Sequence, residues 1–578
     1  GGEGEGEEGE EEQATPVDIG VSCMLLGGVT FVMGLFRLVN WEDDDVRRYA
    51  WNVISNTLAI FLAVLFFRGN KDLVDKYFDD YGVVALCGVH LLHCLLYLVG
   101  LLLVIGTKAG VWLESAEARQ KMFEEKWIVA DSMTHEFGME IDKQLVRAVK
   151  SGHHDAKKSI YFREGLEVSV MKQQVDYERR KHDNRCWATL LAHCGGFAAI
   201  TAGGVMQQSQ PFRQSPLLSA LPVLIMAGFL MLVFSTSGIM RKRLAREASE
   251  QTLKEKDIPA HKRTMSKLDK EVPEHVQMFN EFCGEAERDV LALCVSFLGI
   301  QCVRFSLTGQ LPNEEGLQMP LEFEVQNRHG FIIWLIGAGF MSISIVLPLV
   351  LRKMASAGDQ SEDDHGHAES CQESWTESIM HSMAMSFAWC LMWGARYFWM
   401  ANRFLGLEVW SIPARIILAI CLSGFAFLAV LYLDKISDAA KGDKTTEKLV
   451  GTIVAAISLM VGFIWEHSFE GAVTDVAQLN ASHPCTTKFV LGLVVVYMLV
   501  WSWRDYILKK AMQLEDLKKA RDEAKKKHDE QENEKKYNQG DRSSEEAAGP
   551  SPDIGRSGSR SNGYVALSNV ENGECSLR

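Results

Sequence analysis

The chain has 578 residues, of which 47% are hydrophobic and 23% carry a charge, and its formal net charge is −15. These averages hide two populations, because long apolar blocks nearly free of charge alternate with blocks dense in Lys, Arg, Asp and Glu. This alternation excludes a soluble globular protein and predicts a protein that crosses a membrane several times.

The N-terminal segment is strongly acidic. Seven glutamates fall within the first twelve positions, with no apolar residue among them to anchor a fold. We therefore expect residues 1–17 to form an acidic disordered tail. Because the chain starts at Gly1 and not at Met, we expect any targeting segment to lie upstream of this sequence.

Eleven segments are long and apolar enough to cross a bilayer, which takes roughly 20 apolar residues as a helix. They are residues 19–39, 50–67, 81–106, 186–206, 216–240, 288–308, 330–351, 379–401, 412–433, 449–465 and 488–503. The sixth is the weakest, because only fourteen uncharged residues from Val290 to Val303 precede Arg304. Since helices satisfy their own backbone groups in lipid, the predicted fold class is an all-α polytopic integral membrane protein.

The distribution of basic residues predicts the orientation of these spans. Lys and Arg number fifteen in 107–185 and ten in 241–287, against three in 68–80 and none in 466–487. Basic connections stay cytoplasmic, so we expect the N-terminus outside or in a lumen and the C-terminus in the cytoplasm. The sequon at Asn480 then lies on the outer side and is a predicted glycosylation site.

The same charge pattern predicts how the chain is organised between the spans. The predicted regions are transmembrane helices 1–3 in 18–106, a cytoplasmic charged helical loop in 107–185, helices 4–5 in 186–240, a cytoplasmic charged loop in 241–287, helices 6–11 in 288–503, a cytoplasmic charged helix in 504–537 and a disordered tail in 538–578. The helix in 504–537 is predicted as a solvated helix, with a coiled coil as the alternative, because Arg521 and His528 interrupt its apolar seam.

A short motif recurs in two spans. The sequence Phe-Leu-Ala-Val-Leu occupies residues 61–65 and again 427–431, in units that the predicted topology orients oppositely. Inverted repeats are typical of transporters, so the recurrence indicates a possible inverted repeat, with chance similarity of apolar segments as the alternative.

Ionisable groups inside apolar spans are costly and mark candidate functional residues. We expect no Asp or Glu in the middle of a span, which leaves His90, His93, His193 and Arg396 as ion-pathway candidates. Cys87, His90, Cys94 and His193 form a candidate metal set, because imidazole and thiolate suit zinc or copper. The alternative is neutral histidines bonded to the backbone and cysteines that serve as small packing residues.

Three further groups are candidates for packing or ion attraction. Glu466, His467 and Glu470 lie at the outer end of the tenth span, where they are predicted to attract cations or sense pH, with an ordinary helix end as the alternative. Arg396 follows Trp393 on the aromatic eighth span and indicates either a cation–π pair or an interfacial belt. Small residues at 195, 199 and 203 predict a ridge that lets another helix approach closely.

The function predicted from these features is transport, by a channel or a secondary transporter, of small cations or protons. The alternative is a non-transporting membrane scaffold or sensor that acts through its cytoplasmic loops and C-terminal helix. The chain has no Walker loop, no dinucleotide-binding glycine motif, no Gly-x-Ser-x-Gly and no His-Glu-x-x-His, so no enzyme is expected, and the sequence leaves any cofactor unknown. The expected partners are the lipid bilayer of a plasma membrane or endomembrane and a cytoplasmic protein at the C-terminal tail, with no nucleic acid.

Overall fold

The computed structural model describes residues 16–112, 157–255, 272–318, 323–357, 366–402, 411–439, 444–480, 482–518 and 521. The predictions for the acidic tail, for most of the 107–185 loop and for the tail 538–578 concern residues outside these ranges, as does most of the predicted helix 504–537. The chain divides into two compact units, residues 1–515 and 516–578. All sites described below lie in the first unit.

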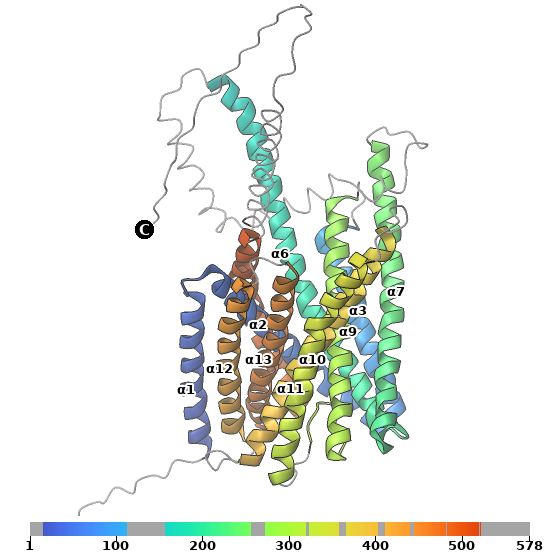
Figure 1. Ribbon diagram of the computed structural model, residues 1–578, viewed down its shortest axis with the longest axis vertical. Helices are drawn as coiled ribbons and strands as arrows, with labels where there is room; N and C mark the ends of the chain where they lie inside the picture. Colours follow the sequence, from blue (N-terminus) through green and yellow to red (C-terminus); the bar gives the residue numbers. More distant parts are fainter. Residues whose placement is uncertain are drawn as a thin grey trace, which may run out of the picture. The chain divides into compact units, whose positions relative to one another are not determined.

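The first unit is built from long α-helices, and its described residues include no strand (Figure 1). The helices are α1 (Pro16–Val39), α2 (Asp44–Phe78), α3 (Val83–Ala109), α6 (Lys157–Gln208), α7 (Pro216–Glu255), α9 (Glu274–Thr308), α10 (Phe323–Ala357), α11 (Gly366–Asn402), α12 (Ile412–Ala439), α13 (Lys444–Gln478) and α14 (Pro484–Ser502). The short elements are the 3-10 turns η1 (Asp79–Tyr81) and η3 (Phe212–Gln214) and the π-helical turn η6 (Trp503–Leu508).

Nine of the described helices are long and apolar enough to cross a membrane. They are α2, α3, α6, α7, α9, α10, α12, α13 and α14. The all-α, polytopic character predicted from the sequence is therefore confirmed. Helices α1 and α11 run beside them, α1 against α12 and α11 against α10 (Figure 1). The total of eleven spans and their orientation stay predictions.

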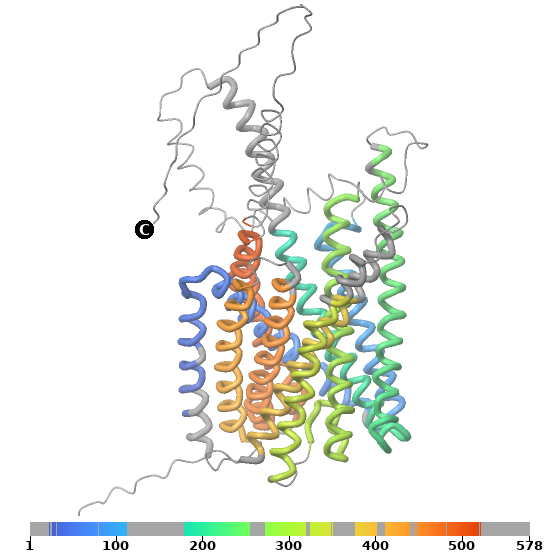
Figure 2. The backbone as a smooth tube through the Cα atoms, viewed as in Figure 1, coloured from blue at the N-terminus to red at the C-terminus, as the bar shows by residue number. Residues whose placement is uncertain are grey.

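The helices differ in how much of their apolar surface they bury. In α6 and α13 most residues of the apolar stretch are buried, whereas in α3, α7, α10 and α14 most are half-buried or exposed. Exposed apolar side chains such as Val84 and Leu217 suit contact with lipid tails. Helix α13 therefore lies at the centre of the bundle, packed against α2, α11, α12 and α14 (Figure 2).

Two central helices extend well past their apolar runs. The sequence places the ends of the second and tenth spans at residues 67 and 465, but α2 continues to Phe78 and α13 to Gln478. Glu466, one residue past the predicted tenth span, is inside α13 and only 1% exposed. Hydropathy marks where apolar residues stop, while a helix continues as long as its backbone bonds are sheltered by neighbours.

An aromatic core fixes the position of α13 just before this charged segment. The Phe463 ring contacts Trp389 of α11, Phe197 of α6 and Phe297 of α9, with ring centroids 4.9, 6.0 and 6.5 Å apart. The Trp389 indole also donates a hydrogen bond to Ser296 Oγ at 3.1 Å. Because such aromatic contacts are close-packed and directional, they set where the next turn of α13 projects its side chains.

Glycines bring neighbouring backbones together at two places that matter for the charged segment. A Cβ on Gly462 of α13 would lie 3.0 Å from the Thr57 carbonyl oxygen of α2, and one on Gly204 of α6 would lie 2.9 Å from Glu314 Cα. The ridge predicted on the fourth span lies in α6. At Gly203 the approach is close, because a Cβ there would overlap Leu298 Cδ1, whereas at Gly195 the spacing is ordinary.

Candidate ion-binding site

Buried charges converge at the end of the bundle where α2, α13 and the α9–α10 connection meet. Arg68 of α2 is 6% exposed. Its Nε lies 2.9 Å from Glu466 Oε1, and its Nη1 lies 2.5 Å from Glu470 Oε1 and 3.4 Å from Glu315 Oε1. Glu466 and Glu470 are one helical turn apart on α13, which is why one guanidinium reaches both. Arg68 therefore joins three carboxylates from two other parts of the chain.

A second cation extends the network along α2. Lys71 Nζ lies 3.0 Å from Asp75, 3.5 Å from Glu315 and 3.8 Å from Glu314. Asp75 in turn contacts His90 Nε2 of α3 at 3.0 Å. The network thus connects α2 to α3 as well as to the α9–α10 connection.

A third cation closes the network on the side of α14. Lys488 Nζ lies 2.7 Å from Asp72 of α2 and 3.5 Å from Glu470 of α13. We call the whole set the Arg68 cluster. It consists of Arg68, Lys71, Asp72, Asp75, His90, Glu314, Glu315, Glu466, Glu470 and Lys488.

The Arg68 cluster has more carboxylates than cations. Six carboxyl groups face three Lys and Arg side chains, and Glu466 Oε2 has no hydrogen-bond partner among the described residues. Most of these carboxyl groups are partly exposed, but Glu466 is only 1% exposed, and a buried negative charge that is incompletely compensated favours a proton or a bound cation.

The α9–α10 connection delivers Glu315 to the cluster through a defined loop. Asn313 Oδ1 accepts hydrogen bonds from the Glu315 and Leu317 amides at 3.2 and 2.6 Å. Arg304 Nη1 donates to the Gly316 carbonyl at 2.7 Å, and Gly316 has a φ of 81°, which an L side chain rarely adopts. The charge of Arg68 holds the pKa of the Glu315 carboxyl below its ordinary value, although burial opposes this shift.

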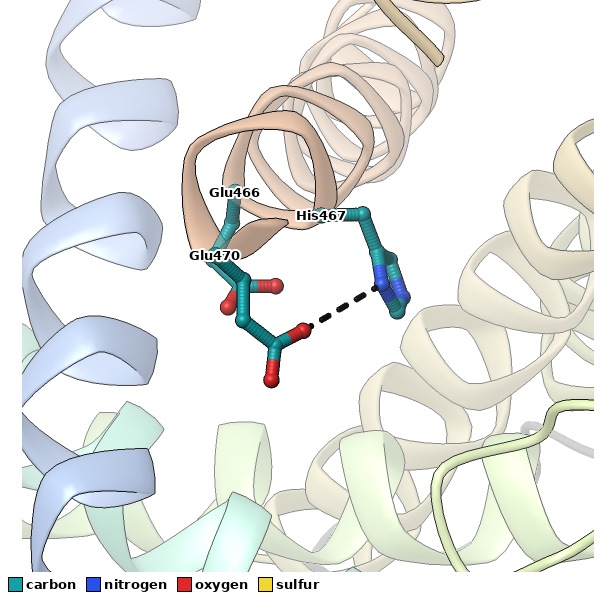
Figure 3. A group of neighbouring side chains, drawn as sticks. All are labelled: Glu466, His467 and Glu470. Atoms are coloured by element: carbon teal, nitrogen blue, oxygen red, sulfur yellow. Dashed lines mark ion pairs between the residues drawn. The ribbon is translucent and has the colours of Figure 1, made fainter. Parts of the chain in front are cut away.

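Glu466, His467 and Glu470, which the sequence analysis groups as a candidate site, lie close together on α13. Figure 3 shows the three side chains projecting from one stretch of α13, with the two carboxyl groups close together. One ligand atom from each lies within 4.8 Å of the others, and His467 Nδ1 is 3.9 Å from Glu470 Oε2. Two carboxylates and an imidazole are a donor set that suits a divalent cation such as zinc.

The predicted histidines separate into different environments. His90 belongs to the Arg68 cluster through Asp75. His93, on the next turn of α3, instead stacks on Tyr97 at a centroid distance of 4.8 Å and packs against Phe67.

His193 of α6 lies outside the cluster as well. Its Nδ1 faces the Thr189 carbonyl of the same helix at 2.7 Å. This is the backbone bond that the alternative interpretation of the intramembrane histidines expects.

The predicted metal set is not brought together within the described residues. Cys94 Sγ donates to the Gly195 carbonyl at 3.6 Å and Cys87 Sγ to the Ala202 carbonyl at 3.7 Å, so both thiols face α6. His90 faces α2 instead. Their sequence spacing places Cys87, His90 and Cys94 near one another on α3, but the two thiols bond to α6 while His90 bonds to α2.

Arg396 lies next to the site but in a separate cavity. Its guanidinium carbon is 5.3 Å from the centre of the Trp393 ring, which is the cation–π geometry that the sequence indicates. Arg304 covers the same ring at 3.9 Å. Arg396 and His467 both line a small cavity between α11, α12 and α13, with Arg415 as the third polar side chain.

Sequence reasoning missed the cations that organise the site. Arg68 and Lys71 follow the second apolar span and Lys488 begins the eleventh, positions where a charge is normally a solvated helix end. One signal in the sequence could have revealed these cations. The Glu466–Glu470 pair lies at a depth equivalent to that of the cations and needs a positive counter-charge.

The predicted glycosylation residue, Asn480, is exposed between α13 and α14, with Nδ2 3.0 Å from Thr487 Oγ1. Searches of protein-family models, curated proteins and solved structures give no match.

Proposed function

We propose that this protein is a multi-pass membrane transporter of protons or small cations and that the Arg68 cluster binds the transported ion. The observation that supports this most strongly is the bridge from the buried Arg68 to the buried Glu466 and the partly exposed Glu470, in a site with an excess of carboxylates. Ionisable groups buried among membrane-spanning helices are expensive and mark ion pathways.

The geometry offers two arrangements of the same charges. In the structure Arg68 neutralises Glu466 and Glu470, and Glu315 lies slightly farther away at 3.4 Å. A proton or cation that binds the two α13 carboxylates replaces Arg68 as their counter-charge. Arg68 then pairs with Glu315 on the α9–α10 connection. When the ion is bound, this exchange weakens the link between α2 and α13. Ion binding is thereby coupled to the position of these two helices relative to each other.

The proposed topology has eleven spans, with α1 and α11 crossing as well, the N-terminus outside and the C-terminus in the cytoplasm. In this topology the connections 68–80, 309–329 and 466–487 all lie on the outer side. Apart from His90 and Lys488, every member of the Arg68 cluster comes from these three segments. The site is then reached from the outer side.

The test is reconstitution of the purified full-length chain into proteoliposomes, followed by flux assays for protons, monovalent cations and Zn²⁺. We expect flux of at least one of these ions above that of protein-free liposomes. If folded protein carries none of them, the transport proposal fails, and the alternative of a scaffold or sensor acting through its cytoplasmic loops replaces it.

A further inference from the structure

Three side chains of α13 have the composition of a metal site. Glu466, His467 and Glu470 project from one stretch of the helix, and one ligand atom from each lies within 4.8 Å of the others (Figure 3). Glu466 is 1% exposed and His467 4%, while Glu470 is half-buried. We propose that these three side chains bind one divalent transition-metal ion of the Zn²⁺ type. The inference rests on the proposed transport function, because it names the class of cation that the Arg68 cluster takes up.

The spacing of the ligand atoms is close to that around a single metal ion. Zn²⁺ lies about 2.0–2.2 Å from nitrogen and oxygen ligands, so two ligands of a tetrahedral ion are roughly 3.4 Å apart. His467 Nδ1 and Glu470 Oε2 are 3.9 Å apart, which is too long for a hydrogen bond but near this value. Glu466 and Glu470 stand at positions i and i+4, the spacing at which two side chains of one helix bind a common zinc ion. Rotation of side chains on a single helix therefore closes the site around an ion.

A buried oxygen of this group lacks the partner that such atoms normally have. Glu466 Oε1 lies 2.9 Å from Arg68 Nε, but Glu466 Oε2 is enclosed and makes no hydrogen bond within the described ranges. The Glu466 carboxyl lies on the same side of α13 as the Glu470 carboxyl and the His467 ring (Figure 3). Nearly all buried polar atoms in folded proteins have a partner, and an unsatisfied one is costly. An ion held between the three side chains supplies this partner.

The charges around the site favour a divalent ion over a monovalent one. Arg68 is the counter-charge of Glu466 and Glu470, and its Nη1 also lies 3.4 Å from Glu315. Lys488, the other cation beside Glu470, lies 3.5 Å from it and pairs more closely with another carboxylate. An ion with two positive charges balances both α13 carboxylates, so that Arg68 is released to Glu315. One proton or monovalent cation balances only one of the two carboxylates.

The imidazole selects among the divalent ions. Mg²⁺ and Ca²⁺ are bound by oxygen ligands, whereas an imidazole nitrogen suits ions of the Zn²⁺ type. Structural zinc sites enclose the ion with four protein ligands, while sites that exchange a ligand hold it with three and leave the fourth position open. Glu466, His467 and Glu470 are a set of three, which suits an ion that must be released again. The ligand class is thus Zn²⁺ and related ions, not Mg²⁺ or Ca²⁺.

The direct test is equilibrium dialysis of the detergent-purified wild-type chain against radiolabelled Zn²⁺. We expect saturable binding of Zn²⁺ that an excess of Mg²⁺ or Ca²⁺ does not displace. Absence of saturable binding to folded protein overturns the inference, and flux of protons or monovalent cations in proteoliposomes would then leave the transport proposal standing. Saturable binding by a protein that carries no ion supports the metal site and contradicts transport. The two failures are therefore distinguishable.

Variants then assign the bound ion to α13. H467Q removes the imidazole ligand and is expected to weaken Zn²⁺ binding about tenfold or more, since even the loss of a group that supports a ligand costs about that much. The matched control is H193Q, at a histidine whose ring faces the Thr189 carbonyl of its own helix, and it should bind Zn²⁺ like the wild type. Co²⁺ bound in place of Zn²⁺ should show the visible bands of nitrogen and oxygen ligands, which H467Q should lose. Equal Zn²⁺ affinity in all three proteins, or a sulfur charge-transfer band in the Co²⁺ spectrum, would contradict the assignment.

Discussion

Arg68 is the residue on which the buried charges of this protein depend. It pairs with Glu466, a carboxylate that is 1% exposed and has no other cation within ion-pair distance among the described residues. Removing one partner of a buried pair costs more than the pair contributes, because the other charge stays buried and uncompensated.

We therefore expect R68Q to lower the free energy of unfolding by about 3–5 kcal/mol. The control is R246Q, at an exposed arginine of α7 that pairs with Glu250, where the loss should be about 0–1 kcal/mol. Denaturant unfolding of both variants in the same detergent measures the difference. A loss for R68Q no larger than that for R246Q would show that the cluster does not hold the helices together.

Glu315 gives the cluster a dependence on pH. Its pKa is lowered from the ordinary 4.5, chiefly by Arg68, so the folded protein binds this proton more weakly than the unfolded chain does. The stabilisation is complete above pH 4.5 and is lost as the pH falls through the lowered folded-state pKa.

We expect E315Q to be less stable than the wild type at neutral pH. This difference should shrink as the pH is lowered below 4.5, because the wild-type carboxyl becomes protonated there as well. Thermal unfolding of both proteins over a pH series measures it. A difference that stays constant across the series would mean that the Glu315 charge is not what stabilises the fold.

At the scale of the elements, α6 positions the α9–α10 connection, which carries two of the six carboxylates of the cluster, Glu314 and Glu315. Gly204 lies against the backbone of Glu314, so a side chain there must displace the α9–α10 connection. This contact explains how the α9–α10 connection is held in position beside Arg68 and Lys71 of α2.

We expect G204A to destabilise the protein by about 1–3 kcal/mol, as overpacking does in a close-packed interior. G228A is the matched control on α7, where a Cβ has no neighbour within 4 Å and alanine is the better helix former. It should be neutral or stabilising by up to about 1 kcal/mol. Thermal unfolding compares the two, and equal effects would argue against the close approach at Gly204.

The elements also show what the sequence can and cannot predict. Hydropathy finds the nine confirmed helices, because apolar runs of that length have few other uses. It misses the charged continuations of α2 and α13, since a buried charge and a solvated one look alike in a sequence. The pairing of Arg68 with Glu466 is equally invisible, because it depends on the packing of two helices that are about 400 residues apart in the chain.

At the scale of the whole molecule, the charge bias predicts a topology that puts the connections of the site on one side. The Glu466, His467 and Glu470 group can be found in the sequence for a different reason, because its members are neighbours on one helix. The histidine and cysteine set on α3 does not come together, since spacing along a helix says nothing about which neighbour each side chain meets.

The orientation is tested at Asn480, which the proposed topology places outside. We expect the protein expressed in a eukaryotic cell to show a mass shift that a glycosidase removes and that N480Q lacks. The side chain is exposed in the connection between α13 and α14, which makes it available. An epitope inserted at this connection and detected only from the cytosol would contradict the orientation.

The central claim is that the Arg68 cluster carries the transported ion, and one comparison tests it most directly. Proteoliposomes containing wild type, E466Q or E287Q are compared for ion flux at equal amounts of folded protein. Glu287 is a buried carboxylate paired with Arg241, away from the cluster, so E287Q breaks an ion pair of the same kind. The account predicts that E466Q abolishes flux while E287Q keeps it. Wild-type flux in E466Q, or equal loss in both variants, would contradict it.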